Sequence, residues 1–196
     1  MKFEELVIEG SDNGLAVVGA DELRLVAGPQ TDWFFHPGGG VRKACVIGAA
    51  KTVEAAVFTL SARVTVGFAA TFDAGALWVQ VDEDNWAKLA FELSGAGYPT
   101  VVSVITRGTS DDADGPSIQG DSVWLRVHCD GRTLAFHFSE DGRHWRFLRW
   151  FTLPGIECRP LRIGFGAQAP IGEGCEVQFR ELRWDLDLIA NLRDGS

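Results

Sequence analysis

Residues 75–93, GALWVQVDEDNWAKLAFEL, alternate between two kinds of side chain on either side of the acidic turn at 82–85. Because successive side chains of a strand point to opposite faces of a sheet, this alternation predicts an antiparallel β-hairpin with one face in a core. The opposite face carries two tryptophans and ionisable groups. The predicted core face is Leu77, Val79, Val81, Ala87, Leu89, Phe91 and Leu93, and the predicted polar face is Trp78, Gln80, Trp86, Lys88 and Glu92.

Short apolar or alternating runs with turn residues between them recur along the rest of the chain, about a dozen in all. Hairpin-type turns such as SEDGR at 139–143 join them, and helical periodicity is almost absent. Residues 185–192 form the exception, with one or two helical turns and a last strand as the alternatives. We expect loops at 36–40, 108–121 and 171–174. This pattern predicts an all-β fold, a two-sheet antiparallel β-sandwich with few or no helices.

The composition indicates one domain spanning residues 1–196. At 46% hydrophobic and 11% aromatic content, the 196 residues suffice for one substantial core. A formal net charge of −9 argues against nucleic acid and anionic membranes as partners, because both are bound through clustered Lys and Arg. No apolar run reaches the ~18 residues of a membrane span, and the first residues show no signal-length run. We therefore expect a cytoplasmic protein.

Neither a metal nor a cofactor is predicted. The four histidines lack metal-binding spacing, and the acidic residues at 82–85 fit a hairpin turn better than a calcium loop. The cysteines show no CxxC or Cys/His cluster, so we expect reduced thiols in or near the core; disulfides in an oxidising compartment are the alternative. These residues are Cys45, Cys129, Cys158 and Cys175.

The polar alternation continues in residues 123–129 and 134–138, which place Trp124, Arg126 and His137 opposite apolar side chains. If these strands share a sheet with 75–93, one face collects aromatic planes together with hydrogen-bonding groups. Aromatic planes stack on sugar rings, and carboxylate or guanidinium groups bind paired hydroxyls. The face therefore predicts a carbohydrate or sugar-phosphate site, with a plain solvated outer face as the alternative.

Several strings also resemble a known family. Residues 75–93, VVSVITRGTSD at 101–111, VWLRV at 123–127 and FSEDGRHWRF at 138–147 resemble, in order and spacing, a family without assigned activity that includes a fungal protein named for regulation of enolase. Asp32 and Trp33 resemble its early Asp/aromatic pair, and the resemblance covers about residues 30–184. It implies a concanavalin A-like lectin/glucanase sandwich of jelly-roll type with a concave sheet.

The resemblance also implies a set of polar positions. Gln80 stands where the family leads us to expect Arg, which removes a cation from the predicted face and argues against carrying over an anionic ligand. The matching positions are Asp32, Asp82, Lys88, Glu92, Ser110, Asp111 and Arg126.

The predicted fold and polar face are compatible with three functions. The favoured one is non-catalytic binding of a carbohydrate or sugar-phosphate; a regulator acting by protein contact and a cryptic glycoside hydrolase or lyase are the alternatives. A hydrolase needs two carboxylates, which would be Glu92 with Asp32 or Asp111, yet no strand with alternating acids is predicted. The predicted ligand-binding residues are Asp32, Trp33, Trp78, Gln80, Trp86, Lys88, Glu92, Ser110, Asp111, Trp124, Arg126 and His137.

Overall fold

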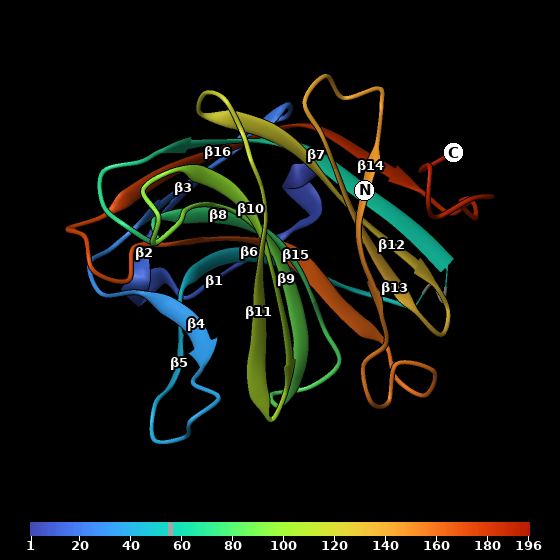
Figure 1. Ribbon diagram of the computed structural model, residues 1–196, viewed down its shortest axis with the longest axis horizontal. Coiled ribbons are helices and arrows are strands. Elements are labelled where there is room, and N and C mark those ends of the chain that lie inside the picture. Colours follow the sequence, from blue (N-terminus) through green and yellow to red (C-terminus); the bar gives the residue numbers. More distant parts are fainter. Residues whose placement is uncertain (55–56) are drawn as a thin grey trace.

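A computed structural model describes residues 1–54 and 57–196, and it confirms the two-sheet antiparallel β-sandwich (Figure 1). Sheet A has seven strands in the order β1-β6-β15-β8-β9-β10-β11. Sheet B has seven in the order β14-β13-β12-β7-β16-β3-β2. A separate two-stranded hairpin, β4–β5, is blue to cyan at the lower left of Figure 1. Only two short 3-10 turns, η1 and η2, add helical structure to the described residues.

The bounds of the elements in sheet A are β1 Val7–Glu9, β6 Ile47–Val53, β8 Ala74–Gln80, β9 Asn85–Leu93, β10 Pro99–Arg107, β11 Thr109–Ser117 and β15 Leu161–Gln168. Those in sheet B are β2 Gly14–Val18, β3 Glu22–Ala27, β7 Val57–Gly67, β12 Ser122–Asp130, β13 Leu134–Ser139, β14 Arg146–Phe151 and β16 Cys175–Asp185. The remaining elements are β4 Asp32–Phe35, β5 Arg42–Cys45, η1 Phe3–Glu5 and η2 Ser11–Asn13.

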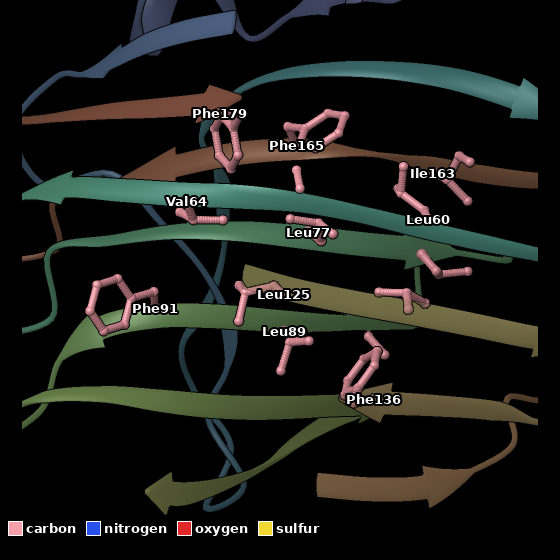
Figure 2. Close-up of a cluster of buried hydrophobic side chains, with 14 of the residues drawn as sticks. Leu60, Val64, Leu77, Leu89, Phe91, Leu125, Phe136, Ile163, Phe165 and Phe179 are labelled. Atoms are coloured by element: carbon pink, nitrogen blue, oxygen red, sulfur yellow. The ribbon is translucent and has the colours of Figure 1, made fainter. Parts of the chain in front are cut away.

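The core lies between the inner faces of the two sheets. Leu77 and Leu89 of sheet A face Leu60 and Leu125 of sheet B across this layer, as Figure 2 shows, and none of the four has exposed surface. The predicted core face of 75–93 is confirmed, with Val81 and Leu93 only partly buried at strand ends. Burying this apolar surface is the main favourable term in folding.

Both predicted hairpin turns are confirmed. Gln80 of β8 pairs with Trp86 of β9 around the acidic turn, and β13 pairs with β14 across residues 139–143. In the second turn Gly142 has φ of 70°, a left-handed conformation that favours glycine. The loops at 36–40 and 171–174 are also confirmed.

Two local predictions are wrong. Residues 108–121 are not one long loop, because Thr109–Ser117 form β11 at the edge of sheet A. This strand has no apolar face that its sequence could reveal; it forms through backbone hydrogen bonds to β10. Charged side chains are common on exposed edge strands. Residues 185–192 form neither a helix nor a further strand, since β16 ends at Asp185 and bends and turns follow.

All four cysteines are free thiols. Cys129 and Cys175 are buried and Cys45 is partly buried, as expected, but Cys158 is exposed and that prediction is wrong. Burial raises the pKa of the Cys129 thiol to about 11 and that of Cys175 to about 12.

In the described part of the chain, no helix combines the length and apolar character needed to cross a membrane.

The close approach of the sheets at Gly75 yields a first prediction. A Cβ at Gly75 would lie 2.4 Å from Val177 Cγ1 and 2.9 Å from Val64 Cγ1. Gly75→Ala should therefore lower the free energy of unfolding by about 1–3 kcal/mol, measured by chemical denaturation, because it overpacks the core. Gly67→Ala is the control, since its Cβ would meet Glu176 O at an ordinary 3.5 Å. Equal losses in both variants would contradict this explanation.

Candidate functional site

The candidate site lies on the outer face of sheet A, which we call the A face, where the β4–β5 hairpin is attached. Trp33 of the hairpin stacks on Trp86 of β9, with ring centroids 4.4 Å apart and planes 28° from parallel. Phe35 packs edge-on against the same ring at 5.5 Å, and its backbone N–H donates to Ser110 Oγ at 2.9 Å. Trp86 has no exposed surface, so it anchors the hairpin and cannot stack on a ligand in this arrangement. The hairpin divides the A face into two hollows.

The first hollow, the Trp78 groove, has a volume of about 450 Å³. The indole of Trp78 packs over glycines of β15. At Gly164, a Cβ atom would lie only 2.7 Å from Trp78 Cζ2, so the ring leaves no room for a side chain there. The indole is only 3% exposed, and its Nε1–H has no hydrogen-bond acceptor among the described residues. The groove is lined by Glu9, Gly10, Asn13, Trp33, Phe35, Arg42, Ala44, Val46, Gly48, Trp78, Gln80, Glu83 and Arg162.

Hydrogen-bonding groups at the rim of the Trp78 groove are held in place by Arg162. Its Nη1 donates to Gln80 Oε1 at 2.6 Å, and its Nη2 forms an ion pair with Glu9. Arg162 therefore supplies a cation beside Gln80, where the resemblance led us to expect Arg. The other lining cation, Arg42, is paired with Asp84. Because both lining arginines are paired and the walls are aromatic, this groove is suited to an uncharged polar ligand.

The second hollow, the Glu92 pocket, has a volume of about 190 Å³. Glu92 is 9% exposed, and no hydrogen-bond or ion-pair partner is found for its carboxyl among the described residues. Lys88, 3% exposed, donates from Nζ to Trp33 O at 2.8 Å and Gln168 Oε1 at 2.7 Å, with Asp32 Oδ1 at 4.0 Å. The pocket is lined by Asp32, Phe34, Phe72, Lys88, Glu92, Val102, Val104, Asp112, Gln168 and Pro170.

Burial controls the protonation of this pocket. It raises the pKa of Glu92 to about 7; Lys88 opposes the shift, while Asp114, Asp32 and Asp112 reinforce it. Burial also lowers the pKa of Lys88, against the opposing effect of Asp32, Glu92 and Asp112. The pocket thus holds a carboxyl group that is partly protonated near neutral pH.

The prediction of a single face shared by four strands is wrong. Trp124 and Arg126 lie on β12 and His137 lies on β13, both in sheet B, on the opposite side of the sandwich from the A face. Alternation along a strand gives its two faces, but it does not say which strands share a sheet.

Residues 186–196, which we call the tail, contact the outer face of sheet B at β12, β13 and β14. Arg126 Nη2 donates to Gly195 O at 3.0 Å, and its guanidinium lies 4.3 Å from the centre of the Trp145 ring. His137 Nε2 is 2.8 Å from Leu192 O. Burial lowers the pKa of His137 to about 4. These side chains hold the tail in the structure.

Asp111 is also misplaced by the sequence prediction. It forms an ion pair with Arg149 Nη2 at 3.0 Å, away from the A face, so its predicted pairing with Glu92 is wrong. Its neighbour Asp112 lines the Glu92 pocket instead. Because 108–121 was expected to be a loop, the alternation of Ser110, Asp112 and Asp114 on the A face went unrecognised. The pairing of Glu92 with Asp32 stays a prediction, since both line one pocket.

Sequence reasoning also missed Arg162 and Gln168. Both belong to the string RIGFGAQ at 162–168, whose outward positions are Arg162, Gly164, Gly166 and Gln168. That period-two signal was present in the sequence.

Asp82 accepts hydrogen bonds from Asp84 N and Asn85 Nδ2, so its side chain stabilises the turn at 82–85. Among the residues described, no cluster of three or more His, Cys, Asp or Glu could hold a metal ion.

A comparison with protein families matches residues 14–186 to the family described as "Protein of unknown function (DUF1349)". The chain belongs to this family. Membership and fold bear out the coarser expectation of a family of unknown function with a lectin/glucanase-like sandwich, while a link to regulation of enolase stays a prediction. No curated protein matches this DUF1349 chain.

Solved structures share the fold of this DUF1349 protein. A functionally unknown protein from Saccharomyces cerevisiae is 22% identical, with a TM-score of 0.87 over 96% of this chain and 100% of that chain. The GH43 protein BlXynB from Bacillus licheniformis is 12% identical, with a TM-score of 0.67 over 92% of this chain and 39% of that one. The alginate lyase from Klebsiella pneumoniae is 12% identical, with a TM-score of 0.53 over 87% and 83%. At these identities the likeness shows the fold alone.

Buried Glu92 makes the stability of the DUF1349 chain depend on pH. Its pKa is raised on folding, so its contribution to stability is full below about pH 4.5 and is lost as the pH rises through about 7. A shift from 4.5 to about 7 corresponds to a loss of up to about 3 kcal/mol between those limits. Glu92→Gln should remove this part of the pH dependence, measured by denaturation from pH 5 to 8.5. Parallel curves for the two proteins would refute it.

Arg126 should matter for stability and not for ligands of the A face. Arg126→Ala removes the hydrogen bond to the tail and should lower the free energy of unfolding by about 1–3 kcal/mol. Limited proteolysis should then cleave the tail faster. The control is Arg24→Ala on the exposed surface of the same sheet, expected to change stability by about 0.5 kcal/mol or less. A tail that remains as resistant as in the wild type would contradict the proposed anchoring.

Proposed function

We propose that this protein binds a neutral saccharide in the Trp78 groove without converting it. One observation carries the proposal: Trp78 lines the groove, and its buried Nε1–H has no acceptor among the described residues. Leaving a buried donor unpaired costs about 1–3 kcal/mol, and a ligand hydroxyl oxygen would recover that free energy. Saccharides supply such oxygens at closely spaced positions.

The lining of the groove supports this chemistry. Trp33 offers a partly exposed aromatic surface beside Trp78, with the two rings nearly perpendicular at 80°. Gln80 and Glu9 are already oriented by Arg162, so a ligand would meet fixed hydrogen-bonding groups. A volume of about 450 Å³ lies within the usual range for small-molecule sites, roughly 300–1,000 Å³.

The groove favours a neutral sugar over a sugar-phosphate. Among the described residues, Arg42 and Arg162 are the only cations that line it, and each is already paired with a carboxylate. A phosphate would have to displace Asp84 or Glu9 from its partner and would approach the lining carboxylate Glu83. The net charge of −9 adds long-range repulsion of anions.

The two alternative functions stay predictions. The raised pKa of Glu92 is what a hydrolase or lyase acid requires, and Asp32 lines the same pocket. The pocket of about 190 Å³ is less than half the volume of the Trp78 groove, which disfavours a polysaccharide chain there. Release of reducing ends from a polysaccharide, abolished by Glu92→Gln, would favour the enzyme. A role as a regulator through protein contact has no specific observation in its favour.

The proposal is tested by calorimetric titration of wild type with a panel of neutral di- and trisaccharides. Trp78→Phe keeps an aromatic ring but removes the N–H, and Gln80→Ala removes a rim group. Each should weaken binding by about three- to tenfold, the loss expected for one hydrogen bond. Gln178→Ala on sheet B is the matched control and should bind as wild type does.

Two results would overturn the saccharide proposal. One is the absence of binding by every saccharide in the panel to folded wild-type protein. The other is unchanged affinity in both Trp78→Phe and Gln80→Ala, with folding of each variant verified by its denaturation curve.

A further inference from the structure

The Glu92 pocket lies on the other side of the β4–β5 hairpin and is not used by the proposed saccharide site. Its unexplained feature is Glu92, a residue that is nine-tenths buried but whose carboxyl makes no hydrogen bond or ion pair with the described residues. Buried carboxyls are normally paired or hydrogen-bonded. A group in the pocket that supplies a donor or a positive charge would therefore stabilise the Glu92 carboxylate.

Lys88 does not fill that role. Four positions separate it from Glu92 along β9, roughly 13 Å at the spacing of a strand. Its Nζ donates to Trp33 O and Gln168 Oε1 and lies 4.0 Å from Asp32. Lys88 is therefore committed to holding the hairpin and β15 together.

Apart from Lys88, the charged side chains that the described residues place around Glu92 are all negative. Asp32 of β4 and Asp112 of β11 line the pocket with Glu92, and Asp114 of β11 acts on the Glu92 carboxyl from nearby. Against these carboxyls stands the single ammonium of Lys88. A cationic ligand would relieve this imbalance, whereas an anionic ligand would increase it.

The apolar walls of the Glu92 pocket indicate which kind of cation it would bind. Phe34, Phe72, Val102 and Val104 supply apolar surface. Metal ions such as Ca²⁺ need six to eight oxygen ligands, and no three acidic side chains in the described part of the chain converge to hold a metal. Apolar walls beside dispersed carboxyls suit an ammonium group on a short carbon skeleton.

We propose that the Glu92 pocket binds a small organic primary ammonium ion, whose nitrogen is held by Glu92 together with Asp32 or Asp112. The carbon skeleton then lies against the phenylalanine and valine walls. This site differs in ligand class and position from the Trp78 groove, and it does not depend on the saccharide proposal.

Binding at this site must be coupled to release of a proton. The protonated carboxyl loses its proton to solvent, and the resulting carboxylate pairs with the ammonium ion, which keeps its three protons throughout. With a free-protein pKa of about 7, roughly half a proton is released per ligand at pH 7. Affinity should rise by about thirtyfold from pH 5.5 to 8 as the ionised fraction of Glu92 grows.

The test is calorimetric titration of wild type with n-butylammonium chloride, with n-butanol as the uncharged analogue. Titrations at pH 7 in two buffers of different ionisation enthalpy measure the protons released. We expect binding of one n-butylammonium per chain, at least tenfold tighter than n-butanol, with proton release at pH 7 and little at pH 8.5. A parallel titration with glucosamine distinguishes an amino sugar from an aliphatic amine as the preferred source of the ammonium group.

Variants locate the site. Glu92→Gln should weaken n-butylammonium binding at least tenfold and abolish proton release, and Asp112→Asn, at an exposed position, should weaken binding several-fold. Glu157→Gln removes the same charge from a remote exposed residue and should bind as wild type does. Trp78→Phe should leave amine binding unchanged, so failure of the saccharide proposal and failure of this one are distinguishable.

Several outcomes would overturn the amine proposal. These are equal affinity for n-butanol and n-butylammonium, unchanged binding in both Glu92→Gln and Asp112→Asn, or binding at pH 7 without proton release. Displacement of n-butylammonium by millimolar Ca²⁺ would identify the pocket as a metal site and would equally overturn it.

Discussion

The arrangement of the A face depends on the stacking of Trp33 on Trp86. A tryptophan on the outer face of a sheet is ordinarily half in water, yet Trp86 has no exposed surface because Trp33 and Phe35 cover it. Large aromatic contacts of this kind contribute more than their buried area alone. They fix the hairpin across the sheet, and the position of the hairpin creates two separate hollows where one open face was expected.

The same contact determines the electrostatics of the Glu92 pocket. The backbone carbonyl of Trp33 in the hairpin and Oε1 of Gln168 in β15 accept hydrogen bonds from the buried ammonium of Lys88. A buried ammonium needs such acceptors to avoid a large desolvation penalty. Lys88 is held there, four positions from Glu92 along β9, so the carboxyl of Glu92 remains without a paired cation, and burial raises its pKa. Packing of the hairpin and protonation of the pocket are thus linked through one side chain.

The fold was predictable from the sequence because alternation is a local property. Leu77, Leu89 and Phe91 are in the core because alternate residues of a strand point to the same face, and their spacing shows this in the sequence. The site was only partly predictable. Alternation placed Arg126 and Glu92 on polar faces, but pairing between strands distant in sequence decides that those faces lie on opposite sides of the sandwich. Asp111 was chosen over Asp112 from the family resemblance and because residues 108–121 were expected to be a loop; an acidic edge strand has no apolar face to reveal its register.

The outer faces of the two sheets look alike in sequence, and what covers each of them distinguishes their roles. On sheet B, carbonyl oxygens of the tail lie within hydrogen-bond distance of Arg126 and His137, so the chain itself occupies that surface. On sheet A, Trp78, whose buried Nε1–H has no acceptor among the described residues, and Glu92 line hollows of about 450 and 190 Å³. Buried polar groups without partners are rare in folded proteins. Where such groups border open space, a ligand would supply the missing partner, which supports our proposal of ligand sites on the A face.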